Sequence, residues 1–191
     1  MGKAANSSIS LKQIHVTDNF WNKYVHLVKD VIIPYQWDIL NDKLEDVETS
    51  HCIENFKIAA GEKEGEFQGA VFQDTDVAKW LEAVGFVLNY ERDEKLEELA
   101  DETIELIGRA QQPDGYLNTY FTIKEPDGRW SNLMEGHELY TAGHMIEAAV
   151  AYYEATGKRR FLEIVSKFAD LVCQTFGSEE GKIHEYPGHQ E

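Results

Sequence analysis

The chain has 191 residues, of which 42% are hydrophobic and 12% aromatic, so it can bury the core of a globular domain and is not disordered. Its 18 basic and 35 acidic residues give a formal charge of −17, which repels the phosphates of nucleic acids and acidic membrane lipids and excludes both as expected partners. No stretch approaches the ~20 apolar residues of a membrane span, and the polar start lacks the apolar core of a signal peptide, so we expect a cytoplasmic protein.

Apolar residues recur at helical spacing from the start of the chain onward. The first helix follows Thr17 and Asp18, which can cap it, and should end before Pro34. A shorter helical piece, roughly residues 52–60, should end at Gly61. Longer segments with one apolar face follow at roughly residues 77–88, 96–107, 139–153 and 161–172.

Two segments between these helices read as loops. Residues 61–74 are rich in glycine and acidic residues, and residues 120–136 contain a Pro-Asp-Gly turn at 126–128. Asp74 or Thr75 is a good N-cap for the helix that follows the first loop. Neither loop has the composition of a linker, so we expect one domain across residues 1–191.

Two helical pairs can be superposed by residue type. Residues 79–83, 99–101 and 115–117 match residues 144–148, 168–170 and 181–183, with about one helical turn added in the second pair. A Gly-His phrase also occurs twice, at residues 136–138 and 188–191, and opens an apolar-periodic segment each time. The pattern predicts an all-α toroid of helical hairpins that is truncated partway through its array.

His137 and His189 occupy equivalent points of this repeat, at the first turns of successive helices. In a closed toroid such helix starts lie around the same end, where their side chains can line one pocket. A neutral imidazole offers one donor and one acceptor, which suits a hydroxyl-rich neutral ligand. The alternative is that Gly-His only caps each helix. Four aromatic residues could supply faces on which a sugar stacks: Trp80, Trp130, Tyr116 and Tyr120. For Trp80, core packing is the better interpretation.

The remaining metal-binding side chains favour no metal site. His15, His26 and His51 are interpreted as satisfied core or surface residues. His144 and Glu147 lie at i and i+3 and could form half of a site, but zinc usually needs three or four protein ligands, so we expect an interhelical hydrogen bond from His144 instead. Cys52 and Cys173 lack metal-ligand spacing and are interpreted as reduced core thiols.

Several long motifs, in the same order, closely resemble glycoside hydrolase family 127, the β-L-arabinofuranosidases. They are residues 72–83, 110–117 and 137–149, supported by residues 33–37 near the start and 187–191 at the end. The resemblance covers nearly the whole chain from about Ile14 onward. It implies a catalytic (α/α)6 barrel of six helical hairpins, followed in full-length members by β-rich domains.

The resemblance also implies retaining hydrolysis of terminal β-L-arabinofuranosides in arabinose-containing glycosides. The expected chemistry uses a cysteine nucleophile, a glutamate acid/base, and a zinc ion held by cysteines and a glutamate. In the family these residues lie well downstream of the segment at 188–191, so we expect no catalytic residue and no metal ligand in this chain. His137 and His189 match positions that contact the arabinose, and neither Cys52 nor Cys173 matches the nucleophile or a zinc ligand.

Other functions stay open on the residues alone. A sugar epimerase or an unsaturated-uronide hydrolase on a similar barrel would place histidines near the same helix starts, and a sugar-binding module would have no chemistry. An incomplete toroid should leave apolar helix faces without partners, including those of the helices that carry Leu139 and Phe161. We therefore expect a fragment that is inactive alone and that self-associates.

Overall fold

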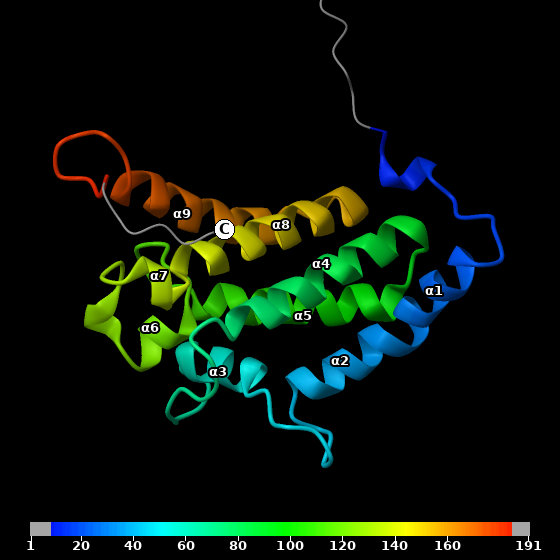
Figure 1. The fold of residues 1–191 in the computed structure, drawn as a ribbon, viewed down its shortest axis with the longest axis horizontal. Coiled ribbons are helices and arrows are strands. Elements are labelled where there is room, and N and C mark those ends of the chain that lie inside the picture. Colours follow the sequence, from blue (N-terminus) through cyan, green and yellow to red (C-terminus); the bar gives the residue numbers. More distant parts are fainter. Residues whose placement is uncertain (1–8, 185–191) are drawn as a thin grey trace, which may run out of the picture.

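The computed structural model describes residues 9–184, which fold as a bundle of helices with no β-strand in that range. The long helices are α4 (Asp74–Tyr90), α5 (Glu94–Ala110), α8 (Glu138–Thr156) and α9 (Arg160–Thr175) (Figure 1). The others are α1 (Trp21–Leu27), α2 (Ile33–Leu40), α3 (Cys52–Ala59), α6 (Thr119–Ile123) and α7 (Leu133–Gly136), with a π-helical turn η2 (Val28–Ile32) and 3₁₀ turns η1 (Leu11–Gln13) and η3 (Pro126–Gly128).

The long helices form two successive hairpins, α4–α5 and α8–α9 (Figure 1). Helices α4 and α8 run in the same direction and make the most extensive helix contact, and α9 packs on α8 and α5. The short helices α3, α6 and α7 gather at the end where α4 and α8 begin (Figure 1). The predicted all-α class and the repeated helical hairpin are confirmed.

The turns after the two hairpins support the repeat at the level of the backbone. Gly115 and Gly181, which the superposition aligns, both adopt left-handed conformations, with φ of +93° and +88°. A Cβ atom on Gly115 would also lie 2.6 Å from the carbonyl oxygen of Lys167 on α9. Glycine is therefore required at this turn both by its dihedral angle and by the approach of α9.

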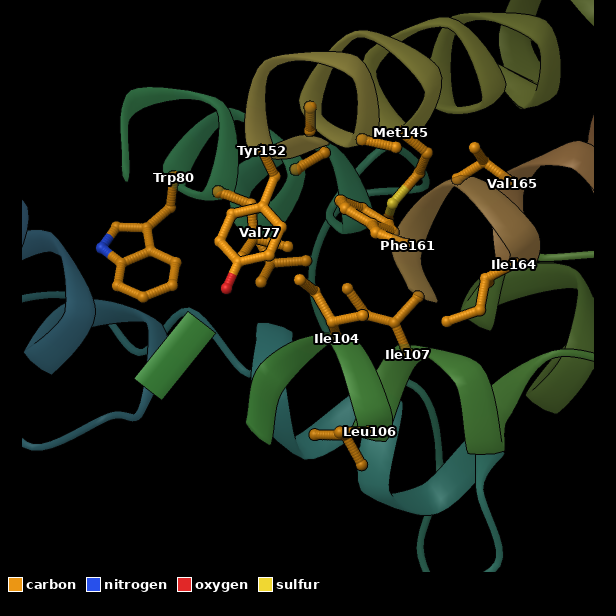
Figure 2. Packing of buried hydrophobic residues seen from close by; sticks show 14 of the residues in the cluster. Val77, Trp80, Ile104, Leu106, Ile107, Met145, Tyr152, Phe161, Ile164 and Val165 are labelled. Carbon is orange, nitrogen blue, oxygen red and sulfur yellow. The ribbon is translucent and has the colours of Figure 1, made fainter. Parts of the chain in front are cut away.

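The core lies between the two hairpins, because the apolar faces of α5 and α9 both point toward α4 and α8. Figure 2 shows Ile104 and Ile107 of α5 approaching Phe161 of α9 and Met145 of α8. Helices α4 and α8 can come this close because α4 carries Gly85 at the crossing point, where a Cβ atom would lie 2.8 Å from the backbone of α8.

The first predicted helix does not end before Pro34. Instead α1 continues through η2 into α2, and Pro34 lies in the first turn of α2. In a regular helix the proline ring would clash with the carbonyl of residue i−4. The π turn widens the backbone at this point, with the Ile33 N–H bonded to the Val28 carbonyl, and this accommodates the ring.

Other local expectations were also wrong. The segment 120–136 contains short helices as well as loops. Neither Asp74 nor Thr75 is the N-cap of α4, because both are buried residues inside the helix. The N-cap is Gln73, and its side chain forms no capping bond. Cys173 lies on the exposed side of α9, whereas Cys52 is buried as expected.

The expected exposure of apolar faces is found on α8, where Val150 and Tyr153 are exposed, but not on α9. The apolar face of α9, with Phe161 and Phe168, is covered by α5 and α8. Large apolar side chains are also exposed along α1 and η2, and on the outer side of the α4–α8 pair. These include Phe20, Trp21, Tyr24, Val31, Phe86 and Val150. None of the helices in the described range 9–184 is long and apolar enough to cross a lipid bilayer.

Candidate functional site

The end of the bundle at which α4 and α8 begin carries a group of buried polar side chains. The first residue of each helix, Asp74 and Glu138, is an acid that is almost completely buried. Buried carboxylates are uncommon unless they accept hydrogen bonds, because burial removes their hydration. Both carboxylates find their donors in the connection between α5 and α8.

Asp74 holds the start of α4 to the start of α6. Its carboxylate accepts the backbone N–H of Thr119 at 2.7 Å and the Thr119 hydroxyl at 2.5 Å. Burial raises the pKa of Asp74 to about 6, and the two hydrogen bonds from Thr119 oppose this rise. The inward turn of Asp74 therefore serves a contact with a residue far along the chain, not a helix cap.

Glu138 makes the corresponding contact at the start of α8. The Tyr116 hydroxyl donates to one carboxylate oxygen, and the backbone N–H of Trp130 donates to the other at 2.7 Å. Burial raises the pKa of Glu138, and these two bonds and the Arg129 charge oppose the rise. The Arg129 guanidinium lies 3.9 Å from the centre of the Tyr116 ring and donates to Asp114 at 2.9 Å.

His137 lies directly before Glu138, between α7 and α8. Its φ of +52° places it in the left-handed region, which is uncommon for a residue with a side chain. Its Nδ1 lies 2.8 Å from the Glu135 carbonyl oxygen, so this nitrogen carries the proton and donates. The ring contacts Phe72 and Tyr140, with centroid distances of 5.1 and 5.7 Å. His137 is the residue at which α7 ends and α8 begins, and its side chain makes no cap bond to α8.

The predicted pairing of His137 with His189 is not tested, because His189 lies outside the described residues. What the structure does show is that the first helices of the two hairpins, α4 and α8, begin at the same end of the bundle (Figure 1). A residue at the start of the next equivalent helix would share this end if the repeat continues in the same way.

The aromatic candidates divide into core and partly exposed residues. Trp80 is buried, and its Nε1 donates to the Ile33 carbonyl at 3.1 Å, which confirms the core interpretation. Tyr116 is also fully buried and cannot stack on a ligand. Trp130 is half-buried against Tyr116, and the Tyr120 hydroxyl donates to Glu125 at 2.6 Å.

The cysteines do not fit the zinc site that the family resemblance implies. The Cys52 thiol is buried and donates to the Gln73 carbonyl at 3.3 Å, and burial raises the pKa of this thiol well above its ordinary value. A thiol held in the protonated form is a poor metal ligand. Within residues 9–184, no cluster of three potential metal ligands includes Cys52 or Cys173.

Sequence reasoning selected His137 as a candidate, which stays a prediction, and it did not single out the two buried acids Asp74 and Glu138 near this end of the bundle. A signal for Glu138 was present, since it follows His137 in the phrase Gly-His-Glu and starts a helix. No comparable signal marks Thr119 as the partner of Asp74. That pairing depends on how the loop after α5 returns to α4.

Comparison with known proteins gives one consistent family. Residues 13–191 match the family described as "Beta-L-arabinofuranosidase, GH127 catalytic domain". The chain is 43% identical, over 93% of its length, to a protein of Bifidobacterium longum subsp. longum named "Non-reducing end beta-L-arabinofuranosidase", of which it covers 30%.

Solved structures agree with this match. A GH127 β-L-arabinofuranosidase from Geobacillus stearothermophilus T6 superposes with a TM-score of 0.90 at 63% identity, over 93% of this chain and 28% of that one. A second structure, described as a GH127 β-arabinofuranosidase, superposes with a TM-score of 0.85 at 36% identity, over 95% of this chain and 29% of that one. The chain thus spans less than a third of the length of these relatives.

Proposed function

This chain belongs to glycoside hydrolase family 127, and from that membership we propose that residues 1–191 form the N-terminal portion of the (α/α)6-barrel catalytic domain of a retaining enzyme that releases terminal L-arabinofuranose. The observation that carries the proposal is the match over residues 13–191, together with 43% identity to a relative named for this activity. Hydrolysis with retention uses two displacement steps, with one nucleophile and one acid/base group. Neither group is assigned to a residue of this chain.

The role proposed for this part of the domain is to hold the sugar. Because Nδ1 of His137 donates to the Glu135 carbonyl, Nε2 of a neutral His137 is the ring nitrogen with the lone pair. It can accept a hydrogen bond from a sugar hydroxyl. His189, which lies outside the described residues, is proposed as the second contact because the Gly-His phrase is repeated there.

The buried acids behind this site would keep the histidine in position. Glu138 anchors the first turn of α8 to Tyr116 and Trp130, so the backbone of the adjacent His137 is fixed in its left-handed conformation. A fixed ring loses less conformational freedom when the sugar binds. The zinc ion implied by the family resemblance would be held by residues other than those of this chain, since Cys52 and Cys173 do not provide a site.

The experiment is to express the longest open reading frame that contains this chain and to assay it on the two p-nitrophenyl anomers of L-arabinofuranose. We expect hydrolysis of the β anomer and little of the α anomer. The isolated 191 residues should release no nitrophenol above the rate in buffer. A full-length protein that cleaves neither anomer would overturn the proposal.

A further inference from the structure

Helices α4 and α8 bring together three side chains with metal-binding atoms, away from the end where His137 lies. They are Glu82 on α4 and the pair His144 and Glu147 on α8. One ligand atom from each residue lies within 4.8 Å of the other two. Nδ1 of His144 lies 3.6 Å from a carboxylate oxygen of Glu147.

Two of these groups lack the partners that their positions call for. Nδ1 of His144 is buried and has no hydrogen-bond partner among residues 9–184, so the interhelical hydrogen bond expected from the sequence is absent. Leaving a buried polar atom unsatisfied costs roughly 1–3 kcal/mol. Glu82 is half-buried, and no described lysine, arginine or histidine forms an ion pair with it by direct contact.

Lys79, the cation on α4, donates to two neutral hydroxyls and makes no direct ion pair with Glu82. Lys79 lies one turn before Glu82, and its ammonium group donates to the Tyr140 hydroxyl at 2.7 Å and to the Thr75 hydroxyl at 3.4 Å. Carboxylate oxygens of Glu82 and Glu147 lie within 4.8 Å of each other, in a chain of formal charge −17. Like charges at this separation repel, and a cation placed between them would remove the repulsion.

The donor set defines the kind of cation. One imidazole nitrogen and two carboxylate oxygens suit first-row transition ions such as Zn²⁺ or Co²⁺, whereas Mg²⁺ and Ca²⁺ prefer oxygen ligands alone. Metal–ligand bonds of ~2.0–2.2 Å require donor atoms up to about 4 Å apart, so the cluster must contract slightly. Glu147 can supply this movement because its side chain is 65% exposed.

The surroundings leave a route for the ion and room for water ligands. The cluster borders an open depression on the α4–α8 face, lined by Lys79, Tyr140, Gly143 and the two α8 ligands. Di-iron sites in helical bundles also combine an acid and a histidine three residues apart on one helix with an acid from a facing helix, although there the order is Glu-x-x-His and here it is His144 followed by Glu147. The helix pair thus supplies the third ligand that the spacing of His144 and Glu147 alone lacks.

We propose that Glu82, His144 and Glu147 form a binding site for a divalent transition ion between α4 and α8. The site shares no residue with the sugar contact proposed for His137. It contains no cysteine, so it is also distinct from the zinc site implied by the family resemblance. The open coordination positions would be filled by water.

Cobalt chloride is the first probe, because Co²⁺ bound to nitrogen and oxygen ligands absorbs visible light. Titration of the purified chain should show saturable binding of one Co²⁺, and added zinc chloride should displace it. Glu82→Gln, His144→Ala and Glu147→Gln should each weaken binding by about tenfold or more. The matched control is Glu154→Gln, which removes an exposed acid from the same helix and should leave the affinity unchanged.

Circular dichroism of each variant checks that the helices remain. If a variant loses helicity, the wild-type chain still tests the proposal by NMR, since bound Co²⁺ should selectively perturb amide signals around residues 82 and 143–148. Absence of saturable binding, equal affinity in the three ligand variants and the control, or perturbation spread over the acidic surface would each overturn the proposal.

Discussion

The hydroxyl of Tyr116 donates a hydrogen bond to the carboxylate of Glu138, and both residues are fully buried. This bond connects the turn after α5 to the first residue of α8. Burial and the charge of Glu138 both raise the pKa of the Tyr116 hydroxyl, so the tyrosine remains the donor throughout the usual pH range. The position of the candidate sugar contact, one residue before Glu138, therefore depends on a connection made within the core.

Tyr116→Phe removes a single oxygen atom, yet it should lower the stability of the chain strongly. It leaves the buried Glu138 carboxylate without one of its donors, which costs roughly 1–3 kcal/mol or more for a charged group. The measurement is urea unfolding followed by circular dichroism. Tyr153→Phe is the control, since Tyr153 lies on the exposed side of α8. Equal stability of the two variants would contradict this role for the bond.

The pH dependence of stability should change when Asp74 is replaced by Asn. The folded-state pKa of Asp74, about 6, is above its ordinary value of 3.8, so the folded chain binds the proton more tightly than the unfolded chain. The resulting stabilisation is fully present below pH 3.8 and is lost as the pH rises through 6. From pH 7.5 to 5, the wild type should gain about 1 kcal/mol relative to Asp74→Asn. Parallel profiles of urea unfolding for the two proteins would show that the carboxyl titrates normally.

Two glycines of the α4–α8 pair should respond in opposite ways to alanine. Gly85→Ala places a Cβ atom 2.8 Å from the backbone of α8 and should destabilise by about 1–3 kcal/mol or more, because two helix backbones must separate. Gly143→Ala meets nothing within 4 Å and should stabilise α8 by up to about 1 kcal/mol through helix propensity. Thermal unfolding of both variants gives the change in stability. If Gly143→Ala lowers the stability as much as Gly85→Ala does, the close approach of α4 and α8 at Gly85 is not the cause of the effect.

His137→Ala in the full-length enzyme should weaken the use of an arabinofuranoside without unfolding the protein. Loss of one hydrogen bond to a neutral hydroxyl corresponds to about 0.5–1.5 kcal/mol in kcat/KM. Steady-state kinetics on the β anomer give the value, with circular dichroism as the check on folding. Unchanged kinetics would remove His137 from the proposed sugar contact.

The exposed aromatic face of α1 should make the isolated chain associate. Phe20, Trp21 and Tyr24 lie in mutual ring contact there and are largely exposed. Sedimentation velocity should show concentration-dependent association and an apolar dye should bind, while Trp21→Ser should reduce both. Gln174→Ser, on the exposed side of α9, is the control. A monomeric chain that binds no dye would contradict the expectation.

Sequence patterns were sufficient for the helices that have a clear apolar face. The long segments later found as α4, α5, α8 and α9 were predicted because helical spacing is a local property. The Asp74–Thr119 pair and the Glu82–His144 approach could not be predicted, since they depend on how separate segments pack. The exposure of Cys173 could not be predicted either, because the apolar residues around it in the sequence do not show which side of its helix faces solvent.

The π turn at Val28–Ile32 also determines which way two neighbouring segments face. One residue advances the direction of side chains around a helix by about 100°. The aromatic residues at the start of α1 point outward, with Phe20, directly before the helix, 58% and Trp21 61% exposed, while Ile33 and Leu40 of α2 point into the core, at 1% and 4%. Deleting one residue from the turn would preserve the composition of both helices but rotate one set of side chains relative to the other. The number of residues in this turn thus sets the angle between the exposed side chains of α1 and the buried side chains of α2. The turn should therefore tolerate substitution better than a change in length.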